Sequence, residues 1–232
     1  MHRRTLLTGA AVAALLAVTG CSGEDEPEAP SPQERLASAQ TKIEETDALT
    51  INLTSTGVPA DVNGVQSATG TGVVEDGVVK FEGEFQGRVS GITATAGILS
   101  IGDETYMKLF TPDYAPVNLD DLGAPNPTTF FEEETGIASL IAATTDVAEK
   151  GQSREGRDIL TEITGTLPGK KVESLLMLGK PGTEFDVAYG LTADDELRRA
   201  VLTGEFYEGT ESTYTLLLTD YGVPIQIESP RS

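Results

Sequence analysis

The chain has 232 residues, with 37 acidic and 16 basic side chains and a formal net charge of −21. This charge argues against nucleic-acid binding, which needs basic groups to neutralise phosphates, and against adsorption to anionic lipid headgroups. The sequence has no tryptophan, a single cysteine and a single histidine, His2. Its hydrophobic content of 38% is ordinary for a globular protein.

The first twenty-one residues have the layout of an export signal. Arg3 and Arg4 form a positive start, and residues 6–18 are an apolar run shorter than the ~20 residues that a membrane-spanning helix needs. Small residues at 18–20 then lead directly into Cys21. This arrangement resembles the lipobox of bacterial lipoproteins, in which the cysteine is acylated and becomes the mature N-terminus. A simple export signal followed by an incidental cysteine is the alternative.

We therefore expect residues 1–20 to be a signal peptide and acylated Cys21 to hold the protein on the outer face of the cytoplasmic membrane, in the cell-envelope space. Two or three acyl chains anchor a protein firmly. With Cys21 acylated and His2 removed, the mature chain could form no disulfide, no Cys-His or Ser-His-Asp catalytic group and no histidine zinc site. We expect no metal and no other cofactor.

The next residues predict a tether followed by a helix. Residues 21–32 are acidic and contain prolines, which is typical of a disordered tether. Ser31 and Glu34 have the spacing of a capping box, and Pro32 suits the first helical position. The apolar spacing that follows predicts an amphipathic helix over residues 32–46.

After residue 47 the hydrophobic period changes from that of a helix to that of a strand. Strands are predicted over residues 49–54, 65–75, 79–89, 92–101 and 104–110. One face of the third strand mixes aromatic residues with glycines: Val79, Phe81, Gly83, Phe85, Gly87 and Val89. These glycines indicate either a bent sheet with space beneath it or tight packing of a helix on the sheet.

The second half of the chain predicts two short helices and more strands. Residues 111–127 contain four prolines and predict an irregular connection, and 135–145 predict a short helix. A further helix is predicted from Gly169, with Gly179 as its C-cap. The predicted strands cover residues 146–155, 157–166, 185–191, 196–206, 213–220 and 223–228. The chain after the tether, residues 33–232, is thus expected to be a single α+β domain with one large, strongly curved antiparallel sheet and helices on its inner face.

Carboxylates are numerous, but no pair is singled out for acid–base chemistry. Residues 132–134 precede a predicted helix, where negative charge suits the helix dipole. Residues 194–196 fit a hairpin turn. We interpret both clusters as structural or solubilising.

Several strings then stand in a characteristic order: FFEEETGIASLI at residues 130–141, GQ at 151–152, ITG at 163–165 and LTDYGV at 218–223. Together with the Cys21 motif, they resemble the LppX/LprA/LprF/LprG family of actinobacterial lipoproteins, nearest in pattern to LprG and LprA. The resemblance covers nearly all of the mature domain.

The resemblance implies a half-barrel sheet whose helices lie on the concave face and enclose an apolar cavity. It further implies a non-enzymatic carrier that binds the acyl chains of lipids or lipoglycans, of triacylglyceride or phosphatidylinositol-mannoside type, and moves them across the envelope. A membrane exporter of the major facilitator class is the partner that it implies. We expect a monomer.

The candidate residues for such a cavity are apolar and lie on the inner strand face or on the helix stripes: Phe81, Phe85, Val89, Phe130, Ile137, Leu140, Ile141, Val172, Leu175 and Leu176. Each could instead be an ordinary core residue, because a filled core and a cavity wall have the same sequence pattern. Two other functions stay open. One is a surface lipoprotein that interacts with partners without lipid cargo, and the other is a hydrolase that uses carboxylates.

Overall fold

The computed structural model of the chain describes residues 29–89 and 91–230. The predicted signal peptide, Cys21 and most of the tether lie outside the described residues. Helices are α1 (Pro32–Glu44), α2 (Ile137–Ala143) and α3 (Gly169–Leu176), with 3-10 helices η1 (Asp120–Leu122) and η2 (Pro127–Phe131). No helix in the described part of the chain is long and apolar enough to cross a membrane.

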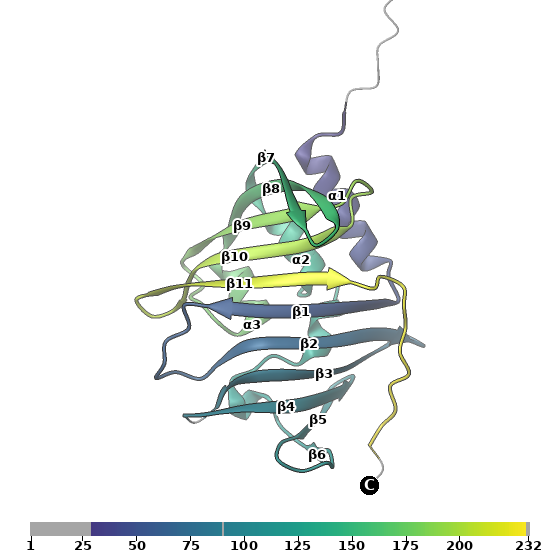
Figure 1. Cartoon of the computed structure of the whole chain (residues 1–232), viewed down its shortest axis with the longest axis vertical. Coiled ribbons are helices and arrows are strands. Elements are labelled where there is room, and N and C mark those ends of the chain that lie inside the picture. Colours follow the sequence, from purple (N-terminus) through teal and green to yellow (C-terminus); the bar gives the residue numbers. More distant parts are fainter. Residues whose placement is uncertain (1–28, 90, 231–232) are drawn as a thin grey trace, which may run out of the picture.

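The strands form one antiparallel sheet (Figure 1). They are β1 (Ala48–Thr56), β2 (Gly64–Glu75), β3 (Val78–Val89), β4 (Ile92–Ile101), β5 (Glu104–Lys108), β6 (Ala115–Pro116), β7 (Thr145–Glu155), β8 (Asp158–Pro168), β9 (Glu184–Leu191), β10 (Leu197–Tyr207) and β11 (Thr210–Thr219). Their spatial order is β6-β5-β4-β3-β2-β1-β11-β10-β9-β8-β7. Since β6 and β7 do not pair with each other, the sheet is open. The predicted α+β class with one large antiparallel sheet is confirmed.

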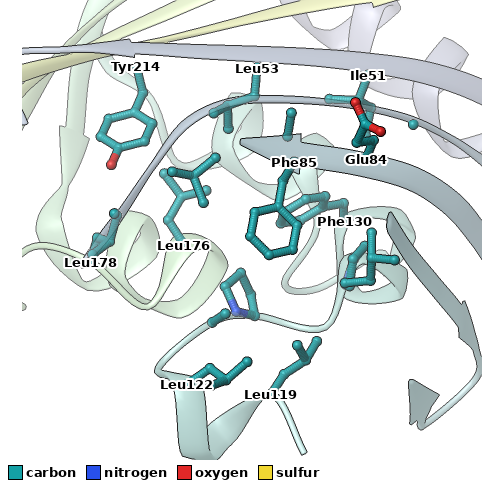
Figure 2. Close-up of a pocket in the computed structure, with 18 of the residues that line it drawn as sticks. Ile51, Leu53, Glu84, Phe85, Leu119, Leu122, Phe130, Leu176, Leu178 and Tyr214 are labelled. Carbon is teal, nitrogen blue, oxygen red and sulfur yellow. The ribbon is translucent and has the colours of Figure 1, made fainter. Parts of the chain in front are cut away.

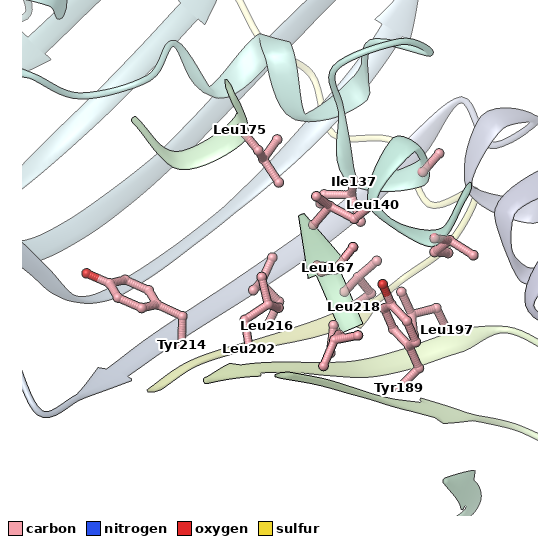
Figure 3. Close-up of a cluster of buried hydrophobic side chains, with 14 of the residues drawn as sticks. Ile137, Leu140, Leu167, Leu175, Tyr189, Leu197, Leu202, Tyr214, Leu216 and Leu218 are labelled. Carbon is pink, nitrogen blue, oxygen red and sulfur yellow. The ribbon is translucent and has the colours of Figure 1, made fainter. Parts of the chain in front are cut away.

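The sheet divides at the β1–β11 pair into two halves. We call strands β1–β6 (residues 48–116) the hollow half and strands β7–β11 (residues 145–219) the packed half. The packed half carries large apolar side chains that meet all three α-helices in one core (Figure 3). Its most deeply buried strand residues are Leu160, Ile163, Leu167, Phe185, Tyr189, Leu191, Leu197, Leu202, Tyr214 and Leu218.

Helix α1 begins as its sequence predicts. The Glu34 backbone N–H donates to the Ser31 hydroxyl at 3.3 Å, and the Ser31 backbone N–H donates to the Glu34 carboxylate at 2.7 Å. These two bonds satisfy backbone donors that the first helical turn would otherwise leave free. Leu36, Ala39 and Ile43 are buried on the side of α1 that faces the core.

The two edge strands are irregular. Strand β7 contains register shifts between Thr145 and Ala148 and between Glu149 and Gly151. Gly151 has a φ of 118°, in a region that only glycine occupies readily. At the opposite edge, β6 has two residues, one of them a proline. Neither edge therefore presents a long regular strand.

Two helix ends differ from the prediction. Helix α2 is shorter than residues 135–145 because Thr144 leaves the helix; its hydroxyl contacts the Leu140 carbonyl and the Tyr189 hydroxyl, both at 2.8 Å. Helix α3 is capped by Met177, with a left-handed φ of 54°, and not by Gly179. A glycine two residues further on was therefore a misleading signal for this helix end.

The predicted strand over residues 223–228 is wrong, because the segment after β11 has no regular secondary structure. Pro224 lacks a backbone donor, which makes a strand there unfavourable. The Gly222 backbone N–H instead donates to the Ala48 carbonyl at 2.9 Å. Ile227 then packs with Val73 and Leu99 in a small second core. Leu99 lies next to Ile98 in β4, so strand alternation puts this second core on the opposite face of the sheet from Ile98.

Candidate functional site

The described residues enclose an apolar cavity of about 180 Å³ against the hollow half of the sheet. Figure 2 shows its walls. The sheet forms one side, and the chain from Leu119 to Phe130 together with the C-terminal end of α3 forms the other. No residue of α1 or α2 lines it. The cavity thus lies beside the packed core and not inside it.

The sheet side of the cavity is built from alternate residues of four neighbouring strands. They are Ile51 and Leu53 of β1, Val65, Ala68 and Gly70 of β2, Phe81 and Phe85 of β3, and Ile98 of β4. The register pairs Ala68 with Phe85 and Gly83 with Ile98, so these positions share one face. Many inward positions of β2–β4 are glycine or alanine, which leaves space that larger side chains would fill.

The glycines of β2 and β3 allow close packing, both on the sheet and between its strands. A Cβ atom on Gly72 would lie 2.0 Å from the ring of Phe131, so this glycine admits tight packing of η2 on the sheet. A Cβ atom on Gly83 would lie 2.4 Å from the backbone carbonyl oxygen of Thr69 in β2. That clash is with backbone, which cannot rotate away, so the close approach of β3 to β2 requires glycine there.

The opposite wall is a loop held to the sheet by polar contacts at one end. The Asn126 amide donates to the Gly102 carbonyl at 2.9 Å, and the Thr128 hydroxyl donates to the same oxygen at 3.2 Å. Between these anchors and β6, the loop contributes Leu119, Leu122, Ala124 and Pro125 to the cavity, and Pro127 joins them from between the two anchors. A wall of this kind can move more easily than a strand in the middle of the sheet.

Tyr214 of β11 is the aromatic residue that the packed half contributes to the cavity. Its hydroxyl lies 2.7 Å from the hydroxyl of Tyr207. Burial raises the pKa of Tyr214 above its ordinary value, and the bond to Tyr207 raises it further. Tyr214 is therefore neutral at physiological pH and adds no charge to the cavity wall.

The charged residues bordering the cavity are Glu84 and Arg88. Strand alternation puts both on the face of β3 opposite Phe81 and Phe85. Among the described residues no group of three or more metal-binding side chains is present. A cavity with this lining can hold an apolar ligand, but it offers no pair of carboxylates for hydrolysis.

A close pair of carboxylates does occur elsewhere, on β7 and β8. Glu155 and Glu162 both contact the guanidinium of Arg199, the first at 2.9 Å. The Ser153 hydroxyl joins this network. Because both acids are paired with an arginine and neither lines the cavity, we interpret the cluster as structural.

The structure brings four of the predicted residues together and separates the others. Phe81, Phe85, Phe130 and Leu176 line the cavity. The other described candidates are buried in the packed core and do not line it: Ile137, Leu140, Ile141, Val172 and Leu175. Val89 ends β3, and its side chain lies outside the described part of the structure.

Sequence reasoning missed most of the remaining lining. The wall segment 119–125 was predicted only as an irregular connection, although Leu119 and Leu122 are large apolar residues in a proline-rich loop. Such residues need a partner surface, and that signal could have been used. Tyr214 and Leu178 could not have been found without the fold, because nothing in the sequence places them beside β2.

The comparisons with known proteins agree with this architecture. The model of the LppX_LprAFG lipoprotein family matches residues 31–227. The chain belongs to this family. The predicted resemblance to this family is thereby confirmed. The matched residues include the sheet, the three α-helices and the wall segment. No curated protein sequence matches the chain at a significant level.

Two solved structures of the family have the same fold. The crystal structure of LprF from Mycobacterium bovis is similar with a TM-score of 0.74 at 14% identity, over 88% of this chain and 99% of that one. Lipoprotein LppX from Mycobacterium tuberculosis is similar with a TM-score of 0.63 at 15% identity, over 85% of this chain and 98% of that one. At these identities the likeness concerns the fold alone.

Proposed function

We propose that this family member is a lipid carrier that takes up acyl chains in the cavity of the hollow half. The observation that carries the proposal is the cavity itself, which is lined by apolar residues and faces no paired carboxylates or metal ligands. Exposure of each CH₂ group to water costs about 0.8 kcal/mol. A protein that shields ten such groups therefore offsets about 8 kcal/mol without any catalytic step.

The size of the cavity bears on the cargo. Its 180 Å³ is below the roughly 300–1,000 Å³ of pockets that enclose drug-sized ligands. In the described conformation it has room for only part of one acyl chain. We infer that a multi-acyl lipid, of triacylglyceride or phosphatidylinositol-mannoside type, enters by displacing the loop wall at 119–125, while the sheet side stays in place.

The envelope role follows from the predicted anchor. Acylated Cys21 would keep the carrier at the outer face of the cytoplasmic membrane, where cargo emerges. An exporter of the major facilitator class would supply the cargo, and the protein would then carry it onward across the envelope as a single copy without enzymatic activity. These points rest on the sequence motif and the family resemblance.

The first test identifies the cargo. The chain from residue 22 on lacks Cys21 and contains every contact described above, so it should keep the fold. Purified from an actinobacterial host and extracted with organic solvent, it should release one or two dominant acyl lipids in near-stoichiometric amount by mass spectrometry. An empty protein that takes up no host lipid would support a surface interaction module instead.

A pocket-filling variant tests the location. Ala68→Phe adds a ring at the sheet side of the cavity, so lipid in the extract should fall strongly while thermal stability changes little. Ala37→Phe is the matched control, because it adds the same ring on the exposed surface of α1. Equal lipid content in both variants would show that the lipid binds elsewhere.

A further inference from the structure

The cavity lining reaches Arg88, one residue before the end of β3 and close to the hairpin that joins β3 and β4. On β4 the residues that share a face with the cavity-lining Ile98 are Ala96, Ala94 and Ile92, by strand alternation. Ile98 and Ala96 are buried, whereas Ile92 is 61% exposed. The inner face of β4 therefore continues from the cavity to a large apolar side chain in solvent.

A second exposed apolar residue lies on the other wall. Leu176 and Leu178 both line the cavity, and Met177 between them is 43% exposed. Its left-handed backbone, at a φ of 54°, turns this residue out of the helix. Glycine is the usual residue in that conformation, since a Cβ atom crowds the backbone there.

Met177 and Phe110 are the two large apolar residues with a positive φ among the described residues. The other non-glycine residues with positive φ are four aspartates, which tolerate this conformation, and Phe110, which is 84% exposed. The backbone of Met177 caps α3 by donating to the Glu173 carbonyl at 2.8 Å, but this cap needs no side chain, and the methionine side chain stays exposed at the edge of the cavity. Strained residues of this kind are often retained for function.

We propose that Ile92 and Met177 form an apolar lip that rests on an uncharged or zwitterionic lipid bilayer while an acyl chain passes into the cavity. This inference rests on the proposed function. A bilayer is the occupant that the cavity favours, because the ligand proposed for the cavity is a bilayer component and the lip continues the cavity lining. The formal charge of −21 opposes docking on anionic lipid.

The absence of cysteine beyond residue 21 makes a direct test possible. In the chain from residue 22 on, Ile92→Cys carries an environment-sensitive fluorophore, and Val78→Cys is the matched control. Val78 is 42% exposed at the opposite end of β3. On phosphatidylcholine vesicles the dye at 92 should shift to shorter wavelength, and the dye at 78 should not. Adding phosphatidylglycerol should reduce the shift. If vesicles changed the emission spectrum of the dye equally at residues 92 and 78, the proposal of a lip at Ile92 would be wrong.

Transfer kinetics test the same inference by function. Ile92→Ser and Met177→Asn should slow uptake of a pyrene-labelled fatty acid from phosphatidylcholine vesicles about tenfold, the effect of losing one buried apolar side chain. Asparagine tolerates the backbone of Met177. Uptake of the same fatty acid presented as monomer in solution should be unchanged, and Val78→Ser should behave as wild type.

The two failures are distinguishable. A wild-type protein that takes up the fatty acid from neither source contradicts the proposed function. Suppose instead that the wild-type protein takes up the fatty acid from both vesicles and solution. If Ile92→Ser and Met177→Asn then take it up from vesicles as fast as the wild type does, the lip alone is contradicted. Vesicle rates that fall in Ile92→Ser but also in Val78→Ser would show a general loss of surface hydrophobicity, and would likewise overturn it.

Discussion

The packed and hollow halves of the sheet have the same strand pattern and opposite interiors. In the packed half, inward positions are large and meet helices, as Tyr189 and Leu202 do. In the hollow half many are small, such as Ala68, Gly70 and Ala96, and a loop faces them. The difference shows that the volume of the inward side chains decides where this fold keeps a cavity, since both halves alternate equally well.

The largest expected effect comes from truncating matched residues in the two halves. Leu202→Ala in the packed half should lower the free energy of unfolding by about 3–5 kcal/mol, because close-packed neighbours cannot fill the space. Ile98→Ala beside the cavity should cost less, about 1–3 kcal/mol, since Ile98 has fewer neighbours to lose. Urea unfolding measures both. Equal losses would mean that the cavity is filled in solution.

A smaller loss of stability is expected from a substitution that tests the packing of Phe131 on Gly72 in the hollow half. Gly72→Ala should destabilise by about 1–3 kcal/mol, because the new Cβ overlaps the Phe131 ring. Adding Phe131→Leu should recover part of this loss, which a double-mutant cycle measures. Gly182→Ala is the control, since nothing lies within 4 Å of a Cβ there, and its change should stay within about 0.5 kcal/mol. Additive effects of the first two changes would contradict the overlap.

A substitution at Met177, where α3 ends beside the cavity, is expected to increase stability. Met177→Gly should raise the free energy of unfolding by about 0.5–1 kcal/mol, because glycine accepts the left-handed backbone. Met177→Ala should give no such gain, since alanine keeps the Cβ. If both variants were equally stable, the backbone at residue 177 would not be strained. The proposed lip adds that the more stable glycine variant takes lipid from vesicles more slowly.

The smallest effect lies on α2, above the packed half. The Ser139 hydroxyl is buried with no hydrogen-bond partner among the described residues, whereas the buried Ser212 hydroxyl donates to the Gly57 carbonyl at 2.9 Å. Ser139→Ala should therefore be neutral or stabilising by up to about 1 kcal/mol, and Ser212→Ala should cost about 1 kcal/mol. Thermal unfolding in parallel gives both values, and a reversed order would contradict the assigned contacts.

The sequence predicts the strands better than the cavity, for a physical reason. Alternation in residues 185–191 or 79–89 reports which face is buried, and the structure confirms those strands. It does not report what lies opposite. Leu140 and Leu176 both belong to apolar helix stripes and to the core, yet only Leu176 also lines the cavity. The outcome depends on the long-range path of residues 119–130 as well as on the size of the inward side chains, and no local pattern encodes that path.

The irregular edge strands have a consequence for the protein in a crowded setting. An exposed regular strand offers its unpaired backbone groups to other chains and promotes growth into larger aggregates. The register shifts in β7 and the proline of two-residue β6 remove that template at both edges. Molecules with an open sheet of this size can therefore avoid edge-to-edge pairing even where many copies share one surface. The sheet does not need to close into a barrel for this.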